Sequence, residues 1–247
     1  MKRYFFKISY DGTSFFGWQK QPNHISIQET IENDLSKIHS LEEISIVGCG
    51  RTDAGVHAHE YFFHWDYVGS IDKENIKYKL NKMLPKSISI HEIKEVPIDM
   101  HSRFSAVQRT YIYLIHTSKN PFNAGQSWYM NQELDISKMN KAAALLIGEK
   151  DFSSFAKTHT DVKNHICRLN YARWTQKEDK ISFEISANRF LRNMVRAIVG
   201  TCVDVGLNKL SIEQFEEIIN KKDRQSASTS APALGLYLNK VNYESHL

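Results

Sequence analysis

Hydrophobic and polar residues alternate at the start of the chain. Phe6, Ile8 and Tyr10 fall on one side of the segment 4–10, and the tripeptide Asp-Gly-Thr follows at 11–13. Alternation with a period of two is typical of a half-buried strand, and the three residues after it favour a turn. The pattern therefore predicts that the chain opens with a strand.

The next hydrophobic pattern has the period of a helix. Apolar residues recur at intervals of three and four from Ile27 to Ile38. Ser26 lies three residues before Glu29, which is a capping-box pattern. We therefore expect a helix that begins at residue 27.

Strand and helix patterns continue along the rest of the chain. Strands are predicted at 44–47, 60–67, 87–93, 110–116, 166–174, 181–187 and 235–241. Helices are predicted before Pro85, over 136–146, from about residue 190 and after a cap at Ser211. We expect an α+β protein of two similar α/β-sandwich halves with antiparallel sheets. Its N-terminal domain would cover 1–103 and its C-terminal domain 104–247.

The composition is that of a globular protein. Of the 247 residues, 41% are hydrophobic and 24% are charged, and no apolar run approaches the roughly 18 residues of a membrane helix. Three widely separated cysteines, Cys49, Cys167 and Cys202, build neither a disulfide framework nor a CxxC metal site, so we expect a cytoplasmic protein. The net charge of +4 permits a polyanionic partner without requiring one.

One carboxylate lies in a glycine-rich segment. In GCGRTDAGVHAHE, residues 48–60, Asp53 follows Arg51 closely and lies between Gly50 and Gly55. Glycines allow a tight turn or close approach to a ligand, and a nearby guanidinium favours an ionised carboxylate and can bind phosphate. The segment is a candidate active site. The alternative is an ordinary turn in which Asp53 caps backbone amides.

Two histidines in the same segment could belong to a metal site. His57 and His59 would point the same way from a strand, and His64 is the one further candidate nearby. A catalytic metal usually takes at least three protein ligands, and no HxxxH or HExxH pattern supplies them. We therefore expect polar or stacking histidines and no metal.

A basic face is predicted on the helix that begins near residue 190. Arg189, Arg192 and Arg196 fall within about 60° of one another at ~100° per residue. No Asp or Glu occurs between Asn188 and Thr201 to pair with them. Such arginines suit a phosphate backbone or a buried carboxylate, although a solvated basic face is the alternative.

Arginines and aromatic residues also alternate further upstream. The stretch 101–113 contains Arg103, Phe104, Arg109, Tyr111 and Tyr113. Cations that bind phosphates beside rings that stack on bases suit single-stranded or flipped nucleotides, but alternating tyrosines in a strand can also fill the core. Trp18, close to Lys20 and Gln21, has the same ambiguity.

Seven ordered blocks of sequence extend over almost the whole chain. They are YDGTSFFGWQKQ at 10–21, SIQE at 26–29, GCGRTDAGVHA at 48–58, RFSAVQRTYIY at 103–113, DFSSF at 151–155, NRFLRNMVRAIVG at 188–200 and GLYL at 235–238. Together they closely resemble the tRNA pseudouridine synthase A family. Two positions depart from the family pattern: Arg-Asn at 192–193 and Ala-Leu at 233–234 stand where relatives often have histidine.

The resemblance implies an isomerase that converts uridine to pseudouridine at positions 38 to 40 in the anticodon stem-loop of tRNA, without a metal or organic cofactor. It implies that Asp53 is the catalytic residue, that Tyr111 stacks on the target base and that Arg196 pairs with Asp53. The implied fold has two α+β halves about a pseudo-two-fold axis. The implied assembly is a homodimer whose basic cleft takes tRNA.

Further substrate-binding residues follow from the resemblance and from the arginine pattern. They are Arg51, Arg109, Arg189 and Arg192. Two other functions stay open: a non-catalytic RNA-binding module with the same blocks, and a metal-dependent hydrolase that uses Asp53, His57 and His59.

Overall fold

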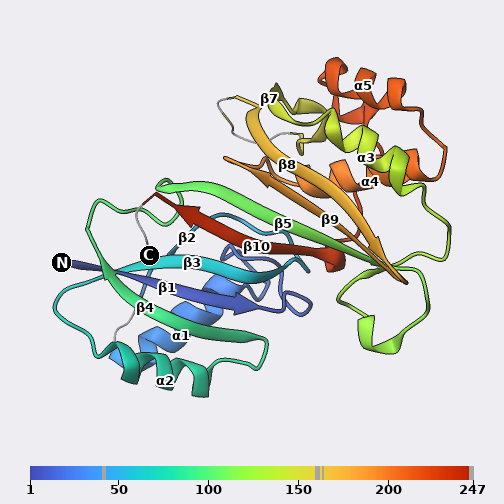
Figure 1. Ribbon diagram of the computed structural model, residues 1–247. Coiled ribbons are helices and arrows are strands. Elements are labelled where there is room, and N and C mark those ends of the chain that lie inside the picture. The colour runs from blue at the N-terminus through green and yellow to red at the C-terminus, as the bar shows by residue number, and fades with distance from the viewer. Residues whose placement is uncertain (41–42, 159–161, 163, 245–247) are drawn as a thin grey trace. The chain divides into compact units, whose positions relative to one another are not determined.

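The computed structural model describes residues 1–40, 43–158, 162 and 164–244 (Figure 1). The chain divides into two compact units, one formed by Met1–Val107 and the segment that begins at Leu238, the other by Gln108–Tyr237. We expected the last strand to belong to the C-terminal domain, 104–247. From Leu238 onward, that strand, β10 (Leu236–Tyr243), instead belongs to the first unit, where it lies beside β3 (His57–Tyr67).

The sheet of the first unit is antiparallel. β1 (Lys2–Tyr10) lies between β4 (Ile88–Val96) and β3, and the short β2 (Val47–Gly48) pairs with β3. α1 (Ile27–His39) and α2 (Lys73–Met83) lie together on one side of this sheet (Figure 1). The predicted opening strand and the first two predicted helices are confirmed.

α1 begins where the sequence predicts. Ser26 has extended backbone angles, and its Oγ accepts a hydrogen bond from the backbone N–H of Glu29 at 3.2 Å. This satisfies one of the amide groups that have no partner within the first helical turn. Ile27, Ile31 and Leu35, which share one face at helical spacing, are completely buried.

The strand predicted at 44–47 is wrong except at its last residue. Ile44 and Ile46 are buried as the alternation suggests. The backbone N–H of Ile46, however, donates to the carboxylate of Glu32 in α1 at 3.1 Å instead of to a neighbouring strand. Strand pairing begins only at Val47, opposite His64.

Both faces of β1 are covered. Phe6 stacks on Phe63 of β3 with ring centroids 4.6 Å apart. Its neighbour Phe5 points the other way, stacks on His64 at 5.9 Å and meets the ring of Tyr243 edge-on at 5.7 Å. The alternation predicted a half-buried strand, but the aromatic residue at the end of the returning strand β10 helps to close the second face.

The second unit contains a sheet with helices beside it. β5 (Ala106–His116) pairs with β9 (Lys180–Ala187), β9 with β8 (Ile166–Lys177) and β8 with β7 (Gly148–Asp151), all antiparallel, and the short β6 (Trp128–Tyr129) is parallel to β5. Three helices pack against one another: α3 (Ile136–Ala144), α4 (Met194–Gly206) and α5 (Ile212–Lys221). Turns of 3₁₀-helix lie at Pro121–Asn123, Ser153–Phe155, Arg224–Ser226 and Ala233–Gly235. The predicted α+β class is confirmed. Within the described parts of the chain, no helix has the length and apolar character to cross a membrane.

A buried histidine joins β3 to the segment after β4. The Nδ1 of His64 accepts a hydrogen bond from the backbone N–H of Ser102 at 3.2 Å, and the side chain is 3% exposed. Burial, together with the charges of Arg3 and His101, lowers the pKa of His64 to about 4. His64 is therefore neutral in the folded protein at neutral pH.

We predict that acid destabilises the first unit through His64. The unfolded chain takes up this proton near pH 6.5 and the folded protein only near pH 4. The stabilisation is thus fully present above pH 6.5 and is lost as the pH falls toward 4. At pH 4.5 the loss should be about 2 kcal/mol, measured as the difference in urea unfolding free energy between pH 7.5 and 4.5. His64→Asn keeps an acceptor at the Nδ1 position and should shrink that difference by the same amount; an unchanged difference would contradict the assignment.

Candidate active site

Asp53 lies in the loop between β2 and β3. The backbone N–H of Val56 donates to the Asp53 carbonyl at 3.2 Å and closes a tight turn, in which Gly55 has a positive φ of 77°. The side chain of Asp53 is partly exposed. The carboxylate is therefore presented by a fixed backbone rather than by an extended loop.

The loop between β1 and α1 lies directly against this turn. The N–H of Trp18 donates to the Thr52 carbonyl at 3.3 Å, and the N–H of Gly55 donates to the Phe15 carbonyl at 3.2 Å. A Cβ on Gly17 would lie 2.3 Å from the Thr52 carbonyl oxygen, and Gly17 has a φ of +83°. Only glycine combines that conformation with so close an approach, so the two loops hold each other in place.

A second close glycine contact, at Gly12, also joins the β1–α1 loop to the Asp53 turn. The Nδ1 of His57 accepts a hydrogen bond from the backbone N–H of Gly12 at 3.1 Å and lies 3.0 Å from the Asp11 carboxylate. A Cβ on Gly12 would lie 2.0 Å from the carbonyl oxygen of Val56. His57, which is 2% exposed, is therefore a structural residue that joins the two loops.

The three histidines of this region bind different partners. His59 lies 3.0 Å from the amide oxygen of Asn239 in β10, and His64 contacts Ser102. In the parts of the chain that the structure describes, no three His, Cys, Asp or Glu side chains form a group that could hold a metal ion. The site geometry therefore gives no support to a hydrolase built on Asp53, His57 and His59.

Trp18 fills the core beneath the candidate loop. It is 2% exposed and stacks on Tyr61 with ring centroids 4.2 Å apart. The Tyr61 hydroxyl donates to the Gly50 carbonyl at 2.5 Å, and a Cβ on Gly48 would lie 2.1 Å from the same hydroxyl. Of the two interpretations open for Trp18, core filling is confirmed.

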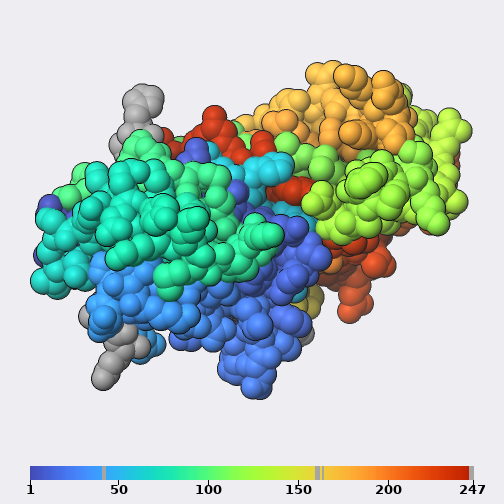
Figure 2. All heavy atoms as spheres, turned by 90° about the horizontal axis from the view of Figure 1, so that it is seen from below, coloured from blue at the N-terminus to red at the C-terminus, as the bar shows by residue number. Residues whose placement is uncertain are grey.

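Arg51 is exposed two residues before Asp53 and is tethered to α1. Its Nε donates to the side-chain oxygen of Gln19 at 3.3 Å, and the Gln19 amide donates to Gln28 at 2.8 Å. Gln28 donates in turn to the buried Glu32 at 2.8 Å. These residues connect the β1–α1 loop, deep blue in Figure 2, to the lighter blue α1 beside it. These hydrogen bonds therefore hold the Arg51 side chain in place while it stays exposed to solvent.

In the second unit, Arg109 and Tyr111 lie on β5. The guanidinium of Arg109 donates to the backbone carbonyl of Asn188 at 3.2 Å. The partly exposed ring of Tyr111 meets Phe190 edge-on, with centroids 5.1 Å apart. The segment after β9 thus holds both side chains.

The predicted row of three arginines on one helix is wrong. α4 begins only at Met194, and Asn193 before it has a left-handed φ of 64°. The side-chain oxygen of Asn188 accepts hydrogen bonds from the N–H groups of Arg168 and Arg189, at 2.9 and 2.8 Å. These bonds hold the segment against β8 in place of a helical turn.

The three arginines consequently have separate environments. Arg189 donates to Asn164 at 3.3 Å, and Arg192 is exposed in the turn before α4. Arg196 alone lies on the helix, where its Nε donates to the Ala231 carbonyl at 2.7 Å. Of the three arginines predicted to form a basic helix face, Arg196 is therefore the one that lies on a helix.

The segment after α5 contains the Ala231 carbonyl that binds Arg196, and Arg224 and Asn193 hold this segment in place. Arg224 donates to the carbonyls of Ala227 and Ser228, each at 3.2 Å, and to the Ser230 hydroxyl at 3.0 Å. Asn193, at one of the two positions that depart from the family pattern, donates to the same hydroxyl at 2.6 Å. Sequence reasoning missed Arg224, because no periodicity or motif marks this segment.

The stretch 101–113 combines surface and core residues. Phe104 is 75% exposed, and the guanidinium of Arg103 lies 5.5 Å from its ring centre. Tyr113 is completely buried and donates to the Pro232 carbonyl at 2.8 Å. Burial raises the pKa of Tyr113, against the opposing charge of Arg196, so its hydroxyl stays protonated.

A family model described as tRNA pseudouridine synthase matches residues 7–105 and 142–244. The chain belongs to the tRNA pseudouridine synthase family. It is 47% identical to the tRNA pseudouridine synthase A of Bacteroides fragilis, over 98% of this chain and 97% of that protein. It is also 47% identical to that of Porphyromonas gingivalis, over 100% and 99%, and 45% identical to that of Bacteroides thetaiotaomicron, over 98% and 91%. The protein is thus an enzyme, an isomerase of the pseudouridine synthase class.

The candidate residues of this pseudouridine synthase lie in both units. Arg51 and Asp53 belong to the first, and Tyr111 and Arg196 belong to the second with the other candidate arginines, Arg109, Arg189 and Arg192. The ranges matched by the family model include Asp53 and Arg196 but not Tyr111. Within their own units, Arg51, Arg109, Arg189 and Arg196 each donate a side-chain hydrogen bond that orients the guanidinium, and Tyr111 contacts Phe190.

Proposed function

We propose that this pseudouridine synthase converts uridine to pseudouridine in tRNA with Asp53 as its catalytic residue. The observation that supports this role most strongly is the backbone contact of Gly17 with the Asp53 turn. A carboxylate on a preorganised turn can meet a reacting sugar or base without losing conformational freedom at that moment. The names of the related enzymes support tRNA as the substrate.

The chemistry requires little more than such a carboxylate. Conversion of uridine to pseudouridine breaks the C1′–N1 bond, turns the released uracil and joins C1′ to C5, while C5 loses its proton and N1 gains one. Atoms and electrons are conserved overall, so the reaction needs no external oxidant or reductant. A carboxylate can act as a nucleophile or as a base in such a sequence.

The uridine must leave its stack before it can react, and the second unit offers the residue types for this step. Removing a base from the stack costs a few kcal/mol. We assign Tyr111 to stack on the extruded base, which fits its partly exposed ring and its support by Phe190. Aromatic stacking contributes about 1–3 kcal/mol per base.

The arginines are proposed to act on negative charge. We assign Arg196 to pair with Asp53, since its Nε is already held by the Ala231 carbonyl and the plane of its guanidinium is thereby fixed. Phosphate contacts are assigned to the remaining arginines of the candidate site, Arg51, Arg109, Arg189 and Arg192.

We further propose that the uridines lie in the anticodon stem-loop and that the enzyme works as a homodimer in the cytoplasm. The seven sequence blocks support the first two assignments by resemblance. The three cysteines, all buried and unbridged, fit a reducing compartment.

Replacement of Asp53 by asparagine should abolish turnover and leave tRNA binding intact. The variant keeps the shape of the side chain and removes the charge. Release of tritium from C5-labelled uridine in tRNA measures turnover, and filter binding measures the Kd. Asp99→Asn, at an exposed position of the same unit, serves as the matched control and should behave as wild type. Retained turnover in Asp53→Asn would rule out the catalytic role.

Arg196→Ala should reduce kcat far more than Arg192→Ala. Removal of one partner of a close ion pair costs about 3 kcal/mol, roughly 100-fold in rate. Arg192 is exposed, so its loss should weaken tRNA binding a few-fold and lower the salt dependence of log K by about one unit, with kcat retained. Single-turnover rates and Kd values over a salt series separate the two effects. Equal, small changes in kcat would contradict the pairing of Arg196 with Asp53.

A further inference from the structure

Two aromatic rings stack on each other at the surface of the β1–α1 loop. The rings of Phe16 and His24 have centroids 4.1 Å apart and an interplanar angle of 21°. Phe16 is 50% exposed, in contrast to the buried Phe15 and Trp18 on either side of it. The pair therefore does not serve the core, and the proposed catalytic step does not use it.

The loop holds this pair rigidly. The backbone N–H of Phe16 donates to the Ile25 carbonyl at 3.0 Å, and the Gln21 side chain donates to the Phe16 carbonyl at 2.7 Å. Asn23 has a left-handed φ of 63° and reverses the chain, so that the backbones of Gln21 and His24 pair in an isolated antiparallel β-bridge. A rigid platform loses little entropy when it binds a ligand.

The pair lies next to the Asp53 turn. Phe16 directly precedes Gly17, and a Cβ on Gly17 would lie 2.3 Å from the Thr52 carbonyl oxygen and 3.1 Å from the carbonyl carbon of Asp53. A ligand that stacks on Phe16 would therefore be close to whatever binds at Asp53.

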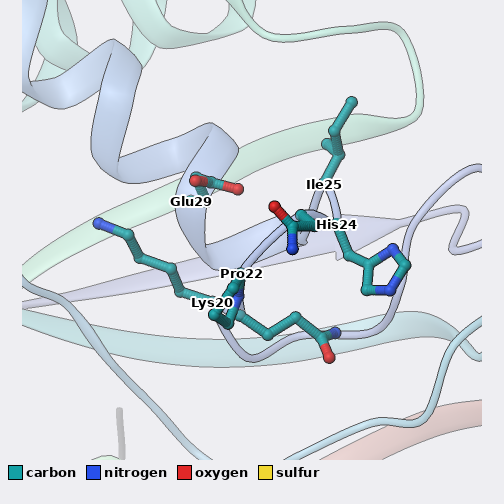
Figure 3. Close-up of a pocket in the computed structure, with 7 residues that line it drawn as sticks. Lys20, Pro22, His24, Ile25 and Glu29 are labelled. Carbon is teal, nitrogen blue, oxygen red and sulfur yellow. The ribbon is translucent and has the colours of Figure 1, made fainter.

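A hollow of about 450 Å³ opens beside the loop (Figure 3). In this view Lys20 and Glu29 lie on one side of the turn at Pro22, and the His24 ring lies on the other. The residues that line the hollow are Lys20, Gln21, Pro22, Asn23, His24, Ile25 and Glu29.

The hollow does not suit a phosphate group. Lys20 already lies 3.8 Å from Glu32 and 4.0 Å from Glu43, and Glu29 adds a further negative charge. Its two amide side chains offer both donors and acceptors at the edge of a planar group. This combination of stacked rings, amides and balanced charge suits a neutral nucleobase.

We propose that the Phe16–His24 pair and the adjoining hollow bind an unpaired nucleotide of the RNA substrate next to the uridine that reacts. The inference rests on the proposed function, because it places that uridine at Asp53. It assigns to the β1–α1 loop a second task besides supporting the Asp53 turn: it holds the neighbouring base out of the RNA stack.

The test compares Phe16→Ala with Phe16→Tyr and His24→Ala. The Kd for a tRNA transcript is measured in the Asp53→Asn background, where chemistry cannot interfere. Phe16→Ala should raise the Kd about ten-fold and His24→Ala by a smaller factor, whereas Phe16→Tyr keeps the ring and should restore binding. Phe122→Ala is the matched control, because Phe122 is 88% exposed in the second unit and should not affect the Kd.

Abasic substitution in the transcript locates the subsite. One abasic residue is placed in turn on each side of the uridine that the wild-type enzyme modifies. At the nucleotide that stacks on Phe16, loss of the base should raise the wild-type Kd about ten-fold and should remove any further effect of Phe16→Ala.

Two outcomes would overturn the subsite. One is a wild-type Kd for Phe16→Ala in protein with an unchanged circular dichroism spectrum. The other is a Phe16→Ala effect that persists with every abasic transcript, as a contact with phosphate or a general loop defect would give. Retained turnover in Asp53→Asn with these Kd effects present would instead contradict the catalytic assignment and leave the stacking result standing.

Discussion

The backbone of the β1–α1 loop touches the backbone of the Asp53 turn with no side chain between them, and the site in the first unit depends on this contact. Gly12 and Gly17 permit it, because any Cβ there would overlap the carbonyl oxygens of Val56 or Thr52. The same contact brings Trp18 under the turn and leaves Phe16 at its rim. The need for glycine at positions 12 and 17 therefore determines how the Asp53 turn is supported, how Trp18 packs beneath it and where Phe16 is exposed beside it.

The second unit uses the same principle around Arg196. A Cβ on Gly200 of α4 would lie 2.0 Å from the Thr229 carbonyl oxygen, so the segment from Arg224 to Ala231 can lie directly on the helix. Arg224 gathers the carbonyls of this segment, and Ala231 exchanges two hydrogen bonds with Arg196. Two charged side chains of the proposed mechanism, Asp53 and Arg196, are thus held where glycine allows close backbone contact.

Much of the fold could be predicted from periodicity. The alternation before Tyr10 and the helical spacing after Ser26 agree with β1 and α1, since each pattern reflects one buried face. The strand at 44–47 failed because a side chain, Glu32, took the backbone hydrogen bond that a neighbouring strand would supply. The helix predicted from residue 190 begins only at Met194, because the Asn188 side chain binds the backbone amides of Arg168 in β8 and of its neighbour Arg189, an interaction that no spacing rule reports.

The sequence predicted less of the candidate site than of the fold. Asp53 was visible as a lone carboxylate among glycines, but its role came from the resemblance, and the family match supports it only at the level of the enzyme class. Arg224, Gln28 and the exposed Phe16 could not be recognised in advance, since their importance depends on partners far away in the sequence or on exposure. The departure at Asn193 proved interpretable only from its contact with Ser230.

The most direct measurement is the single-turnover rate of Gly17→Ala on tRNA, with Gly50→Ala as the control. A methyl group at position 17 meets the Thr52 carbonyl, whereas one at position 50 meets no atom within 4 Å. If the backbone contact positions the catalytic carboxylate, Gly17→Ala should lower the rate at saturating tRNA by at least about ten-fold in a protein that still folds, and Gly50→Ala should keep it. A wild-type rate in folded Gly17→Ala would contradict the account.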